Sequence, residues 1–295
     1  MKFKILIPVY NDWQSVSKLL DDINFNLLNL DHEISVIIIN DASNHDRNEE
    51  EKNFENISSI KILNMKINQG HARCNATGLK FLIEKEEFNH VILMDGDGED
   101  RPEELGLLFN KVEENPTKTV TANRIKRSEG VLFKLLYELH KILTYFFTGK
   151  LIKFGNYSCL TKEDASKIAK ESCVWSSFSG SVTKIIANRI AIPSIRGKRY
   201  FGPSQMNLLN LLIHSLSIIA VFKKTVIIRS IFFLILYLFF ISGNFSIITL
   251  FPVAFLIIFV LMILKTSSRE NMNELNNCLK NIHDVETLSN FDGGQ

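Results

Sequence analysis

The sequence predicts an α/β fold with a mainly parallel sheet, followed by two membrane-spanning helices. In residues 1–125, short apolar runs alternate with amphipathic stretches, which is the pattern of strands connected by covering helices. Residues 230–264 include no charged side chain, and uncharged segments of that length are typical of chains that cross a bilayer. The two observations predict an N-terminal α/β domain and a C-terminal membrane anchor.

The expected strands are short and mainly apolar, and the second, ISVIII, is rich in β-branched residues, as in a strand covered on both faces. They lie at residues 3–9, 34–39, 60–63, 91–94 and 119–123. The expected helices lie at residues 12–30, 70–85 and 102–112. Pro102 opens the last of these, and proline is favoured in the first turn of a helix because no hydrogen bond is lost there.

Polar side chains follow four of these strands directly. The pairs are Asn11 and Asp12, Asn40 and Asp41, Asp95 and Asp97, and Asn123 and Arg124. Ligands of parallel sheets bind at the carboxyl ends of the strands. We therefore expect the four pairs to lie along one edge of the sheet and to form one site.

The most acidic of these strand ends is the stretch VILMDGDGED, residues 91–100. Its carboxylates would repel one another unless a cation lay between them. A calcium loop that started at Asp95 would need glycine and glutamate where the chain has Asp100 and Gly106. Two interpretations remain: an open Mg²⁺ or Mn²⁺ site completed by the phosphates of a substrate, or a solvated acidic turn.

The uncharged C-terminal segment is too long for one membrane helix. A single helix over residues 230–264 would reach roughly 50 Å, whereas the hydrocarbon core of a bilayer is about 30 Å thick. We therefore expect two spans, at residues 225–241 and 246–264, joined by a turn at residues 242–244. A buried hairpin in the core of a soluble protein is the alternative.

Basic residues flank the hairpin on both sides and are absent from its turn. They are Lys223, Lys224, Arg229, Lys265 and Arg269. By the positive-inside rule, both flanks and the N-terminal domain lie in the cytoplasm, so we expect a multi-pass protein of the inner (cytoplasmic) membrane. Arg229 lies close to the start of the first span, where a long side chain can reach the interface.

These features divide the chain into four parts. We expect an α/β domain at residues 1–205, an amphipathic juxtamembrane helix at 206–224, the hairpin at 225–264 and a polar cytoplasmic tail at 265–295. Residues 131–152 interleave aromatic and aliphatic side chains with lysines, which fits either an interfacial helix or a core helix. His140 and His214 are expected to be packing or surface residues.

Charge and cysteine content argue against other classes of protein. The formal net charge is only +2, from 34 basic and 32 acidic residues, so the composition gives no reason to expect nucleic-acid binding. The four cysteines lack the close pairs of a zinc site, and we expect them to be reduced.

The order of motifs resembles that of a known family. ILIPVYND, IINDAS, NQGHARCNATGL, MDGDGEDRPEEL and NRIKR follow one another along the chain. Together they resemble the family-2 inverting glycosyltransferases with a GT-A fold, a Rossmann-like mixed sheet. With its hairpin, the chain is most similar to the branch of dolichyl-phosphate mannose synthases and bacterial polyprenyl-phosphate glucosyltransferases.

The resemblance implies a reaction and its partners. It implies transfer of a sugar from a nucleotide sugar, a UDP-sugar more than a GDP-sugar, to polyprenyl (undecaprenyl) phosphate with inversion. It also implies Mg²⁺ or Mn²⁺ as cofactor and contact with membrane lipid, and it allows a homo-oligomer.

The resemblance assigns roles to residues of four kinds. The nucleotide sugar would contact Pro8, Tyr10, Asn11, Asp12, Asp41, Gly70, Arg73 and Asp95. The metal would bind Asp95, Asp97 and Glu99. The residues closest to the chemistry would be Asp95, Asp97, Arg124, Arg127 and Asn156. The lipid phosphate would meet Arg124, Arg127, Arg199 and Ser204.

Two asparagines depart from the family pattern. Asn40 replaces the first of two paired aspartates, a change that can alter which base is preferred. Asn156 stands where many members have an aspartate, and an amide cannot act as a general base. A phosphate acceptor is already ionised and needs no base, so Asn156 favours that acceptor or has a structural role.

Two other functions stay open. The first is a glycosyltransferase that acts on a saccharide hydroxyl in cell-surface polysaccharide assembly, with Asp100 or Glu99 as the base. The chain lacks the Q-x-x-R-W signature of processive synthases. The second is a catalytically degenerate, membrane-anchored protein that only binds nucleotides.

Overall fold

The protein is built on one mixed sheet of eight strands. The computed structural model describes residues 1–28, 30–45, 47, 52–126, 131–203 and 208–290. The strands are β1 (Lys2–Val9), β2 (Glu33–Asn40), β3 (Ser59–Met65), β4 (His90–Leu93), β5 (Thr119–Lys126), β6 (Ser158–Thr161), β7 (Arg189–Ile195) and β8 (Ile282–Asn290). Their order across the sheet is β7-β5-β6-β4-β1-β2-β3-β8.

The five predicted strands are confirmed, and four of them form the parallel centre of the sheet. β1 pairs in parallel with β2 and β4, and β2 pairs in parallel with β3. The sequence did not predict β6 and β7: β6 pairs antiparallel with β4 and β5, and β7 pairs in parallel with β5. The sheet is therefore mixed, as the GT-A resemblance implied.

Helices cover both faces of the sheet. They are α1 (Trp13–Asn26), α2 (His71–Lys85), α3 (Leu105–Glu114), α5 (Lys162–Ile168) and α6 (Phe178–Ile185), with short 3₁₀ turns at Pro102–Glu104 (η1) and Ser172–Trp175 (η2). α1 and α3 bury Leu19, Ile23 and Phe109 against one face. α2 buries Leu79 and Leu82 against the other, in the same core as α5 and α6. The three predicted helices are thus confirmed, with η1 forming the first turn of the third.

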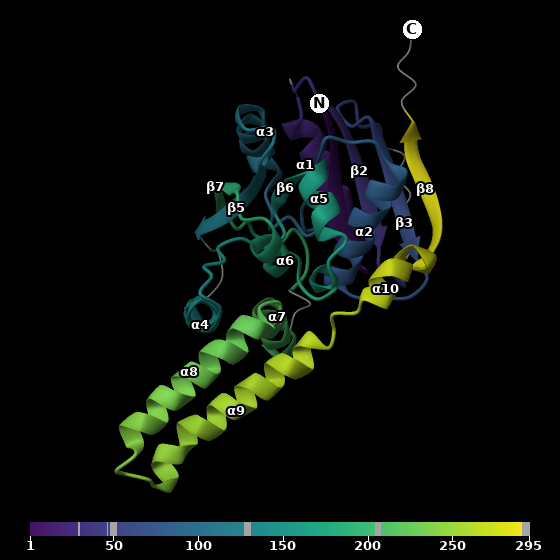
Figure 1. The fold of residues 1–295 in the computed structure, drawn as a ribbon. Helices are drawn as coiled ribbons and strands as arrows, with labels where there is room; N and C mark the ends of the chain where they lie inside the picture. The colour runs from purple at the N-terminus through teal and green to yellow at the C-terminus, as the bar shows by residue number, and fades with distance from the viewer. Residues whose placement is uncertain (29, 46, 48–51, 127–130, 204–207, 291–295) are drawn as a thin grey trace.

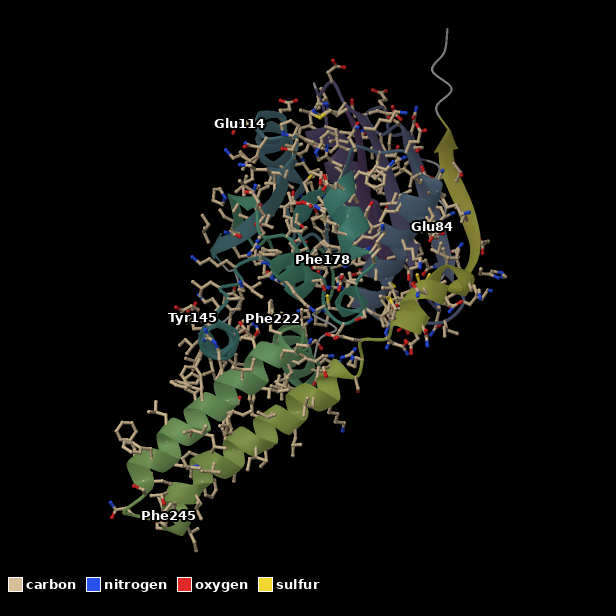
Figure 2. The ribbon with its side chains drawn as sticks, in the orientation of Figure 1. Glu84, Glu114, Tyr145, Phe178, Phe222 and Phe245 are labelled. Carbon is tan, nitrogen blue, oxygen red and sulfur yellow. The ribbon has the colours of Figure 1, made fainter. Side chains whose placement is uncertain are left out.

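Two long apolar helices form a hairpin that extends away from this domain. α8 (Lys223–Ile241) and α9 (Ile247–Ser267) lie side by side, and Phe245 marks the far tip (Figures 1 and 2). Only 17% and 11% of their most apolar windows are buried, so they are not core helices of a soluble protein. By length and composition both can cross a membrane, which marks the chain as a membrane protein.

Two further helices lie where the hairpin meets the domain. They are α4 (Val131–Thr148) and α7 (Leu208–Ala220), which pack with α8 and α9 around a shared apolar cluster. On α4, Phe147 is buried against Phe259, whereas Leu139 and Ile142 are exposed. α4 therefore packs on the hairpin and also presents apolar side chains outward, which combines the two alternatives of the sequence.

Arg229 links α8 to the end of α4. Its guanidinium donates to the carbonyl oxygens of Tyr145 and Phe146, at 3.4 and 2.9 Å. These carbonyls belong to the last turn of α4, where carbonyl groups generally lack a partner within the helix. That of Tyr145 also accepts from the backbone N–H of Gly149 at 2.8 Å. Arg229 thus stabilises a helix end.

The prediction of a polar tail at residues 265–295 is wrong for the described part of this segment, because that part is folded. After α9 the chain forms α10 (Met272–Asn277), a 3₁₀ turn (η3, Cys278–Asn281) and β8, which pairs antiparallel with β3 at the edge of the sheet (Figure 1). The chain therefore leaves the domain, forms the hairpin and returns to the same sheet. The large apolar residues of β8 are three apart, at Ile282, Val285 and Leu288, and so lack the alternation of a strand. Val285 and Leu288 are exposed, and Ile282 is partly buried.

Candidate functional site

The acidic stretch lies at the carboxyl end of β4, in a tight turn. Gly98 has a φ of +85°, a conformation that residues with a side chain rarely adopt. A Cβ at Gly98 would also lie 2.4 Å from the ring of Tyr200. The backbone N–H of Tyr200 donates to the carbonyl of Asp97, so the segment after β7 packs directly on this turn.

Asp95 is held by two side chains from other elements. His71, the first residue of α2, lies 2.9 Å from Asp95 Oδ1 through Nε2. Asn156, just before β6, donates from Nδ2 to the same oxygen at 2.9 Å. Burial alone would raise the pKa of Asp95, but the charge of His71 and these two contacts lower it. Asp95 is therefore ionised and fixed in orientation.

Asp97 faces Arg199, which also reaches the end of β1. Nη1 of Arg199 donates to Asp97 Oδ2 at 2.9 Å, and its Nη2 donates to a carboxylate oxygen of Asp12. Burial and the charge of Asp95 nevertheless raise the pKa of Asp97. One arginine thus links two of the predicted strand ends.

The other two carboxylates of the stretch are also paired with arginines. Glu99 accepts a hydrogen bond from Arg196. Asp100 is buried, accepts from the backbone N–H of Asp95 at 3.0 Å, and lies 3.6 Å from Arg124. Burial and the charge of Asp95 raise the pKa of Asp100 to about 7, against the influence of Arg124.

The ends of β1 and β2 form a second group beside this turn. Asp41 is buried, and its carboxylate accepts from the backbone N–H groups of Gln69 and Gly70, both at 2.8 Å. Asn11 accepts from the backbone N–H of Asn44 at 2.7 Å. Nearby, Tyr10 is 45% exposed, as a side chain free to stack on a ligand would be.

The structure brings most of the expected site residues together. The residues that lie at these strand ends or on their partners are Pro8, Tyr10, Asn11, Asp12, Asp41, Gly70, Asp95, Asp97, Glu99, Arg124, Asn156 and Arg199. Arg73 is the exception, because its guanidinium pairs with Glu274 of α10 at 3.3 Å and stacks over Trp175. Arg127 and Ser204 lie outside the described residues.

The sequence missed two polar residues of the site. His71 lies within residues 70–73, a segment that the resemblance places near the nucleotide, but its contact with Asp95 was not predicted, although its position at a helix start beside Gly70 was a usable signal. Arg196 precedes Arg199 by three residues, and nothing in the sequence pointed to its contact with Glu99.

The donor atoms fit a divalent metal that a substrate would complete. Within the described part of the chain, no group of three or more His, Cys, Asp or Glu side chains is arranged to hold a metal ion. Asp95 and Asp97 supply hard carboxylate oxygens, and burial together with the charge of Asp95 raises the pKa of Asp97. This is the situation in which Mg²⁺ or Mn²⁺ binds through one or two carboxylates together with phosphate oxygens.

The sequence also matches a family model over most of the α/β domain. The model of "Glycosyl transferase family 2" matches residues 4–166, from β1 to α5. The chain belongs to glycosyl transferase family 2. The matched region includes the acidic turn of this family-2 protein, Asn156 and both strand ends around Asp41.

Curated relatives of this family-2 chain carry a more specific name. The undecaprenyl-phosphate 4-deoxy-4-formamido-L-arabinose transferase of Klebsiella pneumoniae is 25% identical over 218 residues, 72% of this chain and 65% of that protein. The protein of the same name from Proteus mirabilis is 24% identical over 215 residues, 72% of this chain and 64% of that protein. The match thus spans a little under two thirds of these relatives.

Solved structures of glycosyltransferases share the fold of this family-2 protein. S. aureus TarS 1–349 aligns with a TM-score of 0.50 and 16% identity, covering 95% of this chain and 88% of that one. The glucosyl-3-phosphoglycerate synthase of Mycobacterium tuberculosis, solved with Mn²⁺, UDP-glucose and phosphoglyceric acid, aligns with a TM-score of 0.52 and 13% identity over 76% of this chain and 79% of that one. These likenesses establish the GT-A fold.

Proposed function

We propose that this protein transfers a sugar from a nucleotide sugar to a polyprenyl phosphate, with inversion, at the cytoplasmic face of the membrane. The observation that carries the proposal is that Asp95 and Asp97 share one edge of the sheet with Arg124 and Arg199. In Figure 1 the N-terminus and the carboxyl end of β3 lie at opposite ends of the sheet, and the latter faces the hairpin. The polar edge therefore lies toward the membrane.

The residues present suit the donor half of the reaction. Asp95 and Asp97 would hold Mg²⁺ or Mn²⁺, which neutralises the negative charge that develops on the departing nucleoside diphosphate. The N-terminus of α2, at His71, lies at the same carboxylate and adds the positive end of a helix. Asp41, Asn11 and Tyr10 form the side of the site that would receive the nucleoside.

The residues also suit an acceptor that is already an anion. Asn156 lies against Asp95 and cannot remove a proton, whereas a polyprenyl phosphate is ionised at neutral pH and can attack without a base. Arg124 lies beside Asp100 and beside Gly155, the residue before Asn156, and could steer a phosphate toward this turn. The curated relatives bear the name of undecaprenyl-phosphate transferases, which supports the same acceptor.

The membrane anchor would place this site at the lipid headgroups. Lys223, Lys224, Lys265 and Arg269 flank the ends of the hairpin nearest the domain, and positive residues favour the cytoplasmic side. The exposed apolar side chains of α4 would meet the bilayer at the same level. We infer that the domain lies on the cytoplasmic face, in bacteria the inner membrane.

The proposal is tested by transfer of radiolabel into lipid. Purified full-length protein is incubated with undecaprenyl phosphate, Mn²⁺ or Mg²⁺, and a panel of labelled UDP- and GDP-sugars, with and without EDTA. We expect acid-labile label in the organic extract that is absent with EDTA. If a donor is consumed only with a saccharide acceptor, the alternative hydroxyl-directed function is correct; if nucleotides bind and no acceptor is labelled, the protein is a binding protein.

A further inference from the structure

Asn40, at the end of β2, uses both of its polar groups within the protein. Its Nδ2 donates to Oδ1 of Asn64 at 2.9 Å, and its Oδ1 accepts from the backbone N–H of Ser43 at 3.0 Å. With both groups engaged, the side chain has a positioning role in the turn that follows β2, rather than direct contact with a base.

Asn64, at the end of β3, is oriented in turn by the strand that returns from the hairpin. Its Nδ2 donates to Asp284 at 2.9 Å and to Glu286 at 2.6 Å, both on β8. Ionised carboxylates only accept hydrogen bonds, so the amide nitrogen of Asn64 must face them and its oxygen must face Asn40. The direction of every hydrogen bond from β8 to Ser43 is therefore fixed by two acids.

The turn that receives this chain of hydrogen bonds is strained and belongs to the nucleotide side of the site. Asn11 and Ala42 have φ values of 53° and 55°, which residues other than glycine rarely adopt. Such conformations persist only where surrounding contacts enforce them. Oγ of Ser43 accepts from the backbone N–H of Asn11 at 2.9 Å. This hydrogen bond joins the segment after β2, which includes Asp41, to the segment after β1.

We propose that Asp284 and Glu286, although they follow the membrane hairpin, are positioning residues of the donor-nucleotide site. Through Asn64 and Asn40 they hold the turn that carries Asp41 and contacts Asn11. The inference rests on the proposed function. It also explains why position 40 carries an amide: an aspartate there would oppose a carboxylate to the carbonyl Oδ1 of Asn64, whose amide nitrogen is already held by the two acids of β8.

The test uses that incompatibility. Asn40→Asp in the full-length protein is expected to weaken UDP or GDP binding, measured by calorimetry with Mn²⁺, by about ten-fold, since a hydrogen bond is replaced by an unpaired contact. In the variant Asp284→Asn/Glu286→Gln, Asn64 is free to turn around and donate to an acid at position 40. Combining all three substitutions should therefore restore the affinity to within about three-fold of the wild type, a non-additive result that only coupled residues give.

Controls separate this role from a loss of folding and from failure of the proposed function. Glu87→Gln changes an exposed acid that pairs with Lys2 at the amino end of β1, and this variant should bind nucleotide like the wild type. If Asn40→Asp has a lower melting temperature but the same affinity for nucleotide as the wild type, Asn40 has only a structural role, and this result would overturn the inference. So would a triple variant that binds no better than Asn40→Asp. If the wild type binds neither nucleotide, the proposed function fails and the inference falls with it.

Discussion

Asn156 and Asp95 are joined by a hydrogen bond of 2.9 Å from the amide Nδ2 to the carboxylate Oδ1. The contact makes Asn156 a support for a proposed metal ligand. Loss of such a support usually lowers metal affinity or activity by about 10- to 100-fold. Asn156→Leu keeps the approximate shape without the donor, so we expect the Mn²⁺ concentration for half-maximal transfer to rise at least about ten-fold. An unchanged metal titration would remove Asn156 from this role.

The variant Asn156→Asp tests whether the site lacks a general base. A phosphate acceptor needs no deprotonation, and the new carboxylate would repel Asp95, so we expect turnover at saturating Mn²⁺ to stay equal or fall. Initial rates with undecaprenyl phosphate check this. A rate increase of about ten-fold or more would instead indicate that the natural acceptor is a hydroxyl whose proton must be removed.

Asp97→Ala is expected to reduce transfer by at least about 100-fold, because the proposed metal and the developing diphosphate charge lose a partner. The variant should melt near the wild-type temperature, since Asp97 is partly exposed at a turn. Glu114→Ala is the matched control, at the end of α3 far from the hairpin (Figure 2). Wild-type rates in Asp97→Ala at saturating Mg²⁺ would exclude Asp97 from the chemistry.

Gly149→Ala is expected to loosen the junction between the domain and the hairpin. Gly149 has a φ of +70°, and an added Cβ would lie 2.6 Å from Nη2 of Arg229. The guanidinium would have to leave the carbonyls at the end of α4, so we expect a lower melting temperature in detergent, equivalent to about 1–3 kcal/mol. Gly106→Ala has open space around its Cβ and should not destabilise the protein. Equal melting of both variants would show that the Arg229 contact contributes little.

The contacts of Glu86 are expected to make the stability of the fold sensitive to acid. Burial would raise the pKa of Glu86, but hydrogen bonds from Lys61 and Lys4 outweigh burial and lower it below the ordinary 4.5. The contacts of Glu86 with Lys4 and Lys61 therefore stabilise the folded state fully above about pH 4.5. This stabilisation is lost as the pH falls through the lower pKa that Glu86 has in the folded state. Melting temperatures across that range should depend less on pH in Glu86→Gln. The neighbouring Glu87→Gln should keep the wild-type dependence, because Glu87 is 88% exposed.

The sequence predicted the elements that carry a strong apolar pattern. β1, β2 and β4 are mostly apolar, and α8 and α9 are apolar over nearly their whole length. β6 has only four residues and β8 is a polar edge strand, so neither carries a hydrophobic signal. Strand pairing at an edge depends on backbone hydrogen bonds, which any sequence can make.

The candidate site was predictable to the extent that topology alone assembles it. Asp41, Asp95 and Asp97 meet because parallel strands end at one edge. The side-chain partners were not predictable, since Arg199 lies 102 residues from Asp97 and Glu286 lies 222 residues from Asn64. Arg73 shows the opposite case: its place in a motif suggested the site, but tertiary packing turned it toward α10.

The return of the chain from the hairpin to β8 also sets the order of assembly. β3 is synthesised early and stays without its outer neighbour until α8 and α9 have been made, because β8 follows them. Asn64 gains its carboxylate partners only at that moment. A ribosome must therefore release the whole membrane segment before the proposed nucleotide side of the sheet is complete, so that biogenesis delivers a finished version of the proposed donor site only in a chain that already carries its two apolar helices.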